Sequence, residues 1–378
     1  MIKIIARIII TTIAAGVVIL AGCGKKETGM IKIGAILPLT GDLAIYGQKM
    51  KKGIDLAIEQ KNKNGGIGGK KVFALYEDDI GDPKISISAF QKLVTFEKVP
   101  VVIGGAISRT AAPLIPIANQ NRVVLFSPAA TAPDLAGKSK YFFRNWPSDV
   151  FDGEAMAEFA SKNLKIKKVA IFYVKNEWGT AISKIFSDEY KNLGGQISFI
   201  ESYDQNSTDF RTQLLKINTS TPDAIFLPGY LKELILILTQ KREMKIDCRI
   251  LSAYGFFDPK ILELPKDALE GAVFTAPFFD PDAQDTVIKM YNKSYQSVYD
   301  EIPDIWSAQS YDAANLILSV LSKGDRSGPQ IQTGLANIKN YPGVSGLTSF
   351  DKNGEVVKPL RIMTVKEGKF INYSLSAQ

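Results

Sequence analysis

The regular alternation of short apolar runs with longer stretches of helical pattern is the feature that most constrains the fold of this chain. Between residues 30 and 127, the apolar runs "MIKIGAILPL", "KVFALYEDD", "VPVVIGG" and "RVVLF" alternate with helical patterns, such as those at 46–62 and 108–119. The alternation restarts near residue 151 and continues to "CRILSA" at 248–253. It predicts parallel sheets with helices on both faces. Because 378 residues exceed one ordinary core, we predict two α/β lobes.

The last hundred residues have a different pattern. Two long helices are expected at about 282–299 and 305–321. A β-like tail follows them, and its "FDKNGE" segment is a hairpin-turn signal.

The first 22 residues are interpreted as a secretory leader and not as part of the fold. A basic start precedes the uncharged stretch 8–20, and Leu-Ala-Gly-Cys then ends at Cys23. This ending resembles the lipobox of bacterial lipoproteins, which implies cleavage before Cys23 and attachment of lipid to it. An uncleaved transmembrane anchor is the alternative, since the apolar stretch with its flanks nearly reaches spanning length. Residues 23–29 are expected to form a short tether.

The composition argues against several classes of function. The chain has no histidine, which removes histidine-based triads, histidine general bases and most zinc sites. Apart from Cys23 it has only Cys248, which lies among apolar strand residues and is expected to be a buried, inert thiol. No G-x-S-x-G elbow is present. Its 46 Lys and Arg are scattered against 39 Asp and Glu, with no nucleic-acid module. We therefore predict no enzyme activity, metal, cofactor or nucleic-acid partner.

Residues 123–135, "VVLFSPAATAPDL", are the most informative short stretch. An apolar run typical of a buried parallel strand breaks into serine, proline, two alanines and threonine. A plain turn is one interpretation. A ligand site is the other, because open α/β sheets bind ligands beyond the carboxyl ends of their strands.

The ordered set of motifs resembles the leucine/isoleucine/valine-binding proteins, the extracellular solute receptors of ABC importers. These motifs are "GAILPLTGDLAIYGQ", "NGGIGGKKV", "EDDIGDP", "IGGAISRTA", "SPAATAPDL", "YFFRNWPSD", "SYDAANLI" and "FDKNGE". The resemblance implies the type I periplasmic-binding-protein fold, an α/β fold with two doubly wound parallel-sheet lobes joined by three hinge crossovers. It places lobe 1 at 30–149 and 277–357, and lobe 2 at 150–276 and 358–378.

The resemblance also implies a grip for a ligand carboxylate in lobe 1. Its positions fall on Ser108, on Ala129 with the adjacent Ala130, and on Thr131. Small residues let backbone N–H groups approach an anion, while the two hydroxyls add donors. Ser108 also starts a helix, whose positive end favours negative charge. The plain alternatives are a helix cap at Ser108 and a turn residue at Thr131.

An aromatic wall is implied at Tyr46, Trp178 and Tyr230, although loop aromatics also serve as ordinary packing. One position departs from the family. Amino-acid-binding members carry an acid for the ligand ammonium where this chain has Tyr254, in "SAYGFF". Asp304 is a weak candidate to replace it.

Glu301 and the tandem acids at 77–79 are two further candidates to pair with the ligand ammonium, and each is instead expected to be a surface or capping residue.

The predicted function is that of a lipid-anchored receptor of the bacterial cell envelope. It would capture a small carboxylate ligand, such as a branched-chain or other apolar amino acid, and deliver it to ABC permease subunits. An aromatic or aliphatic carboxylate or amide without the amino group is the alternative ligand. An extracellular enzyme and a sensory ligand domain are alternatives of other classes. The sensory domain would need an attached signalling segment, which we do not expect within these 378 residues.

Overall fold

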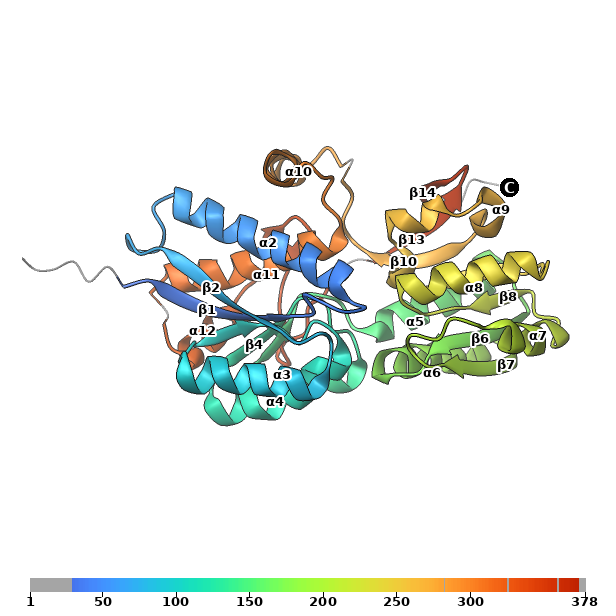
Figure 1. The fold of residues 1–378 in the computed structure, drawn as a ribbon, viewed down its shortest axis with the longest axis horizontal. Helices are drawn as coiled ribbons and strands as arrows, with labels where there is room; N and C mark the ends of the chain where they lie inside the picture. Colours follow the sequence, from blue (N-terminus) through green and yellow to red (C-terminus); the bar gives the residue numbers. More distant parts are fainter. Residues whose placement is uncertain (1–28, 282, 325, 359, 374–378) are drawn as a thin grey trace, which may run out of the picture.

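The computed structural model describes residues 29–281, 283–324, 326–358 and 360–373. Two sheets lie side by side, each with its own helices (Figure 1). We call the half built on the five-stranded sheet lobe 1 and the half built on the seven-stranded sheet lobe 2.

Lobe 1 contains a parallel sheet with the strand order β2-β1-β3-β4-β5. Its strands are β1 (Ile31–Leu37), β2 (Val72–Asp78), β3 (Val101–Ile103), β4 (Val124–Ser127) and β5 (Phe142–Arg144). The strands β3 and β4 are buried along their whole length, and β1 is buried from Ile33 to Leu37, as expected for a sheet covered on both faces.

Helices cover both faces of this sheet (Figure 1). The helices α2 (Ala44–Lys63) and α11 (Ile305–Ser322) pack together on one face, and α3 (Pro83–Gln91) and α4 (Ser108–Asn121) on the other. Asp82 starts α3 by accepting hydrogen bonds from the amides of Lys84 and Ile85, with proline at the first helical position. The remaining lobe 1 elements are α10 (Thr286–Tyr299), α12 (Gly328–Ala336) and the hairpin of β11 (Tyr341–Gly343) and β12 (Gly346–Thr348).

Lobe 2 contains a mixed sheet with the order β14-β13-β10-β9-β8-β6-β7. The parallel strands are β6 (Lys168–Val174), β7 (Gln196–Tyr203), β8 (Ala224–Phe226), β9 (Arg249–Ser252) and β10 (Val273–Pro277). The strands β13 (Leu360–Lys366) and β14 (Lys369–Asn372) add an antiparallel edge. The helices are α5 (Asp149–Glu158), α6 (Glu177–Asn192), α7 (Arg211–Thr219), α8 (Leu231–Glu243) and α9 (Lys266–Leu269). α5 and α6 pack together, and α8 lies on the opposite face (Figure 1).

The chain passes between the two sheets three times: after β5, after β10 and before β13. This is the predicted type I architecture, and it brings the carboxyl ends of strands from both sheets to the junction between the lobes. Four strands and α-helices were not predicted: the short strands β5 and β10, the four-residue helix α9 and the nine-residue helix α12. The "FDKNGE" segment closes only a single bridge, Phe350 to Val356, and the hairpins lie before and after it.

Candidate functional site

All nine predicted ligand residues lie in the described part of the chain, and eight of them come after the carboxyl ends of strands. In lobe 1, Tyr46 follows β1, Ser108 follows β3, and residues 129–131 follow β4; in lobe 2, Trp178 follows β6, Tyr230 follows β8, and Tyr254 follows β9. All of these residues are buried. The fold therefore brings these eight residues together at the junction between the lobes, where one site is expected from the sequence.

The loop after β4 is organised by serine hydroxyls. Ser108 Oγ accepts hydrogen bonds from the backbone amides of Thr131 at 3.3 Å and Ala132 at 3.1 Å. Ser127 Oγ accepts from the amide of Ala130 at 2.9 Å and donates to the carbonyl of Gly105. These amides thus have protein acceptors, so the donor that Ser108 offers to a ligand is its own O–H group.

Arg144, which the sequence analysis did not select, holds the same loop through hydrogen bonds to its backbone carbonyls. It is fully buried, and its Nη1 donates to the carbonyls of Ala132 at 2.9 Å and Ala130 at 3.4 Å. Its Nε donates to both carboxylate oxygens of Glu355. Because a buried guanidinium with a carboxylate partner has little freedom, the loop is fixed before any ligand arrives.

Six buried aromatic side chains form a closed cycle at the junction, which we call the aromatic cycle. Lobe 1 contributes Tyr46, Trp146 and Trp306, and lobe 2 contributes Trp178, Tyr230 and Tyr254. In the order Tyr46, Trp306, Trp146, Tyr254, Trp178, Tyr230 and back to Tyr46, successive ring centroids are 4.6, 4.8, 4.8, 5.3, 5.2 and 6.2 Å apart. These spacings are typical of favourable aromatic contacts.

Trp146 and Trp306 are the members of the aromatic cycle that sequence reasoning missed. Trp146 stands inside the quoted motif "YFFRNWPSD", and Trp306 lies in the first turn of α11. An aromatic residue beside a lobe crossover was the signal available for Trp146.

Two hydrogen bonds join the lobes directly at the aromatic cycle. The Thr131 and Tyr254 hydroxyl oxygens are 2.8 Å apart, and Tyr46 Oη accepts from the amide of Leu231 at 2.9 Å. Burial raises the pKa of Tyr46 and of Tyr254 above the usual value for a phenol. Both phenols therefore stay neutral, so Tyr254 supplies no negative charge to the site.

Asp304 caps α11 and belongs to an ion-pair network between the lobes. Its carboxylate accepts from the amide of Ser307 at 2.9 Å and lies 2.8 Å from Lys49 Nζ. Lys49 Nζ is also 2.9 Å from Asp258 Oδ2 of lobe 2. Burial lowers the pKa of Lys49, but the two carboxylates raise it by more, so the lysine stays charged. Asp304 is thus already paired with a cation.

The other two acidic candidates also have protein partners. Glu301 pairs with Lys52 at 2.6 Å, on the surface of lobe 1. In the tandem acids, Asp78 accepts from the hydroxyl of Thr40, and Asp79 accepts from that of Ser86. They lie at the end of β2 as turn and capping groups.

Asp149 is the acid at the junction that the sequence analysis did not select. It begins α5, its amide donates to the Thr131 carbonyl at 3.0 Å, and its Oδ1 accepts from Trp178 Nε1 at 3.1 Å. Its Oδ2 is buried without a hydrogen-bond partner among the described residues. Burial and the nearby Asp152 carboxylate raise the pKa of Asp149, against the lowering effects of Thr131, Arg144 and Trp178.

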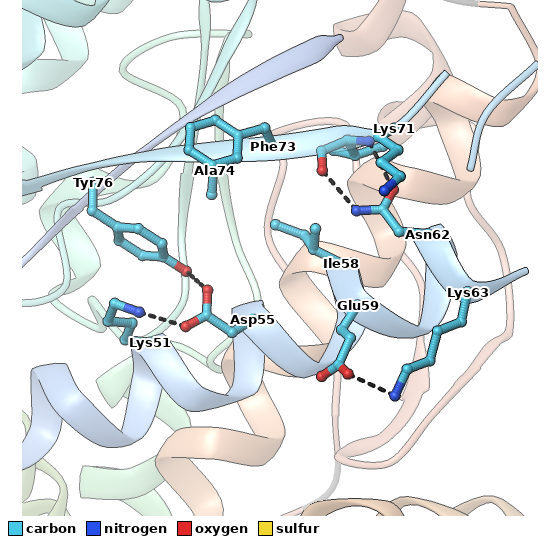
Figure 2. A pocket seen from close by; sticks show the side chains of 11 residues that line it. Lys51, Asp55, Ile58, Glu59, Asn62, Lys63, Lys71, Phe73, Ala74 and Tyr76 are labelled. Carbon is cyan, nitrogen blue, oxygen red and sulfur yellow. Dashed lines mark hydrogen bonds and ion pairs between the residues drawn. The ribbon is translucent and has the colours of Figure 1, made fainter. Parts of the chain in front are cut away.

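Two cavities lie near these elements. A surface groove of about 620 Å³ runs between α2 and the edge strand β2 (Figure 2). Two ion pairs lie within the groove: Lys51 contacts Asp55, which also accepts a hydrogen bond from the Tyr76 hydroxyl, and Lys63 contacts Glu59. The groove contains none of the predicted ligand residues.

The second cavity borders the aromatic cycle. It measures about 230 Å³ and lies at the seam between the lobes, where Tyr46 and Tyr230 form part of its wall. At its rim, Lys232 of lobe 2 pairs with Asp42 of lobe 1 at 2.9 Å. The seam at this point is therefore closed by a charged contact as well as by aromatic packing.

The predicted lipidation residue, Cys23, lies outside the described residues. Within the described ranges, no helix has both the length and the apolar character needed to cross a membrane.

Comparison with known proteins identifies relatives of the same architecture. A leucine-, isoleucine-, valine-, threonine- and alanine-binding protein of Pseudomonas aeruginosa is 26% identical over 86% of this chain and 87% of that protein. The crystal structure of a leucine-binding protein from Thermotoga maritima superposes with a TM-score of 0.85 at 29% identity, over 91% of this chain and 98% of that one.

A branched-chain amino acid transporter substrate-binding protein from Streptococcus pneumoniae, solved with isoleucine, gives a TM-score of 0.84 at 30% identity. The match covers 91% of this chain and all of that one. A family model described as periplasmic binding protein matches residues 30–369. The chain therefore belongs to the periplasmic binding protein family.

Proposed function

We propose that this chain is the substrate-binding component of an ABC importer and that it captures an apolar α-amino acid, of the branched-chain class, between its two lobes. Family membership and the amino-acid-binding relatives support this role. The observation that carries the proposal is the aromatic cycle, which takes three side chains from each lobe and lies beside the hydroxyls of Ser108 and Thr131. An apolar surface with a few fixed polar groups is typical of a small-molecule site.

The geometry supports the two roles expected from the sequence, one group of residues for the ligand carboxylate and another for the ligand side chain. Ser108 and Thr131 would hold the ligand carboxylate at the start of α4, where the helix dipole favours an anion. Tyr46, Trp178 and Tyr230 would surround the side chain. Lobe boundaries at 149/150, 276/277 and 357/358 remain part of the proposal, as does hinge closure of the lobes on the ligand.

A carboxylate or amide without an amino group is the second candidate ligand. The neutral Tyr254 at the position of the family's acid favours it, since a phenol offers no charge to an ammonium. Aromatic rings also attract a cation through their faces, which keeps an ammonium acceptable at the same site.

A binding role without catalysis is favoured over an extracellular enzyme. The chain has no histidine, and burial raises the pKa of the Cys248 thiol to about 11, which keeps it protonated and unreactive. We also propose that Cys23 carries lipid, which would anchor the receptor in the bacterial cell envelope, at its periplasmic or extracellular face.

The test is a thermal-shift screen of amino acids, aromatic acids and amides, followed by calorimetry on those that stabilise the protein. A ligand that binds only the folded chain must raise the melting temperature. We expect the largest shifts with leucine, isoleucine or valine. If none of the amino acids, carboxylates or amides shifts the melting temperature at millimolar concentration, the proposed function is wrong.

A further inference from the structure

A buried α-amino acid needs a negative partner for its ammonium. A charge buried without one is strongly unfavourable, because the desolvation of the ion is not offset. The two obvious partners are not available here. Tyr254 is a neutral phenol, and the Asp304 carboxylate is paired with Lys49 and caps α11. A receptor for amino acids therefore requires another acid at the junction.

Asp149 is placed where such an acid is required. Its backbone amide donates to the carbonyl of Thr131, the residue expected to hold the ligand carboxylate. Its Oδ1 accepts from Trp178, a member of the aromatic cycle. Its Oδ2 is buried and has no hydrogen-bond partner among the described residues. One carboxylate oxygen is thus fixed by the protein, while the other keeps its capacity to accept.

We propose that the Asp149 carboxylate is the specificity group of this receptor: it accepts the ligand's ammonium through Oδ2 and so selects α-amino acids over carboxylates that lack an amino group. The proposal rests on the proposed function, because it assigns the second half of the same site. It gives Asp149 the role that position 254 of this chain cannot fill.

The position of Asp149 also explains why ligands with an amino group would be selected. A ligand carboxylate at Ser108 and Thr131 would lie close to Asp149, because Thr131 contacts Asp149 through its backbone. Two like charges in a buried site repel, whereas an ammonium on the ligand's α-carbon would lie beside the Asp149 charge and neutralise it. A ligand with a carboxylate and no amino group would therefore bind only while Asp149 holds a proton, and it would offer the ionised carboxylate no partner.

Several groups face Asp149 from the elements around it. Asp152 lies one turn later on α5, Trp178 is on α6, Thr131 follows β4, and Arg144 ends β5. The Asp149 charge also acts on the hydroxyl groups of Tyr230 and Tyr254.

Arg144 is the only cation among these groups, and it is already paired with the Glu355 carboxylate. The unliganded carboxylate is consequently short of positive charge, and burial with Asp152 favours its protonated form. An arriving ammonium favours the ionised form, so receptor molecules whose Asp149 carries a proton release it to the buffer as the ligand binds.

The experiment uses matched ligand pairs on the intact receptor. Leucine is compared with 4-methylpentanoate, and phenylalanine with 3-phenylpropanoate, by calorimetry on the wild type, Asp149→Asn and Asp152→Asn. We expect Asp149→Asn to weaken amino-acid binding by at least roughly 30-fold, the lower range for removing one partner of a buried charge pair. Binding of the analogues should be unchanged or tighter. Asp152→Asn is the matched control, because its carboxylate oxygens have no hydrogen-bond partner among the described residues, and the change should alter amino-acid affinity far less.

The second readout is the proton balance of binding. Amino-acid binding to the wild type, measured between pH 5 and 8 in buffers of different ionisation enthalpy, should release a proton, and binding to Asp149→Asn should not. Amino-acid affinity retained within about threefold in Asp149→Asn would overturn this inference alone. So would equal loss of both members of a ligand pair, or a wild type that releases no proton at any of these pH values. A wild type that binds no member of either pair would overturn the proposed function and this inference together.

Discussion

The buried carboxylate of Asp152 gives a quantitative prediction for the stability of lobe 2. Neither of its oxygens has a hydrogen-bond partner among the described residues, and burial raises its pKa to about 7, although the Thr275 side chain on β10 lowers it slightly. An ordinary aspartate in the unfolded chain titrates at about 3.9. The folded state therefore binds this proton more tightly than the unfolded state.

The direction and size of the effect follow from proton linkage. Between pH 4 and pH 7 the folded chain carries the proton and the unfolded chain does not, so the free energy of unfolding falls as pH rises. The slope for one proton is about 1.4 kcal/mol per pH unit, and over three units Asp152 costs about 4 kcal/mol. The contribution is fully present below pH 4 and is lost as pH rises through about 7.

Asp152→Asn removes this titration and keeps the size of the side chain. Urea unfolding of the wild type and the variant at pH 5, 6 and 7 measures the effect. The stability advantage of the variant should grow by about 2–3 kcal/mol from pH 5 to pH 7, with most of the titration complete by pH 8. Two curves that stay parallel over this range would show that Asp152 is ionised in the folded protein, and the reasoning from burial would be wrong.

Three further predictions concern binding and localisation. Thr131→Val should weaken ligand binding by roughly 1.5–3 kcal/mol in calorimetry, since it removes a donor to a charged group; unchanged affinity would remove Thr131 from the anion grip. Lys49→Met removes the ion pair with Asp258 between the lobes, so it should weaken ligand binding and reduce the salt dependence of binding, while Lys52→Met, whose ion pair lies within lobe 1, should do neither. Equal effects of the two variants would argue against a role of the ion pair between the lobes in binding. Cys23→Ser should leave the receptor soluble or unprocessed in membrane fractionation; a cleaved variant that still sediments with membranes would exclude lipidation at that residue.

Much of the fold could be predicted because its signal is local. A buried parallel strand needs only a short apolar run, and the helices that follow show caps such as Asp82 before Pro83. The strands β5 and β10 were missed for a physical reason. β5 has three residues within a proline-bearing passage, and β10 follows a run of short helical turns, so neither shows alternation with a helix. The strand β13 pairs with β10, which lies far earlier in the sequence, so no local window shows where the tail joins the sheet.

The candidate site depends on contacts that local sequence patterns do not show. Asp149 lies in the first turn of a helix, where an acidic residue is favoured by the helix dipole whatever else it does. Its sequence neighbourhood is therefore explained without any ligand. What distinguishes it are its contacts in space: Thr131 follows β4 of lobe 1, and Trp178 lies on α6 of lobe 2. Because the contact with Thr131 exists only when both lobes are assembled, an acid that could recognise a ligand and an acid that merely starts a helix look identical in one sequence. Only burial with an unshared oxygen separates them.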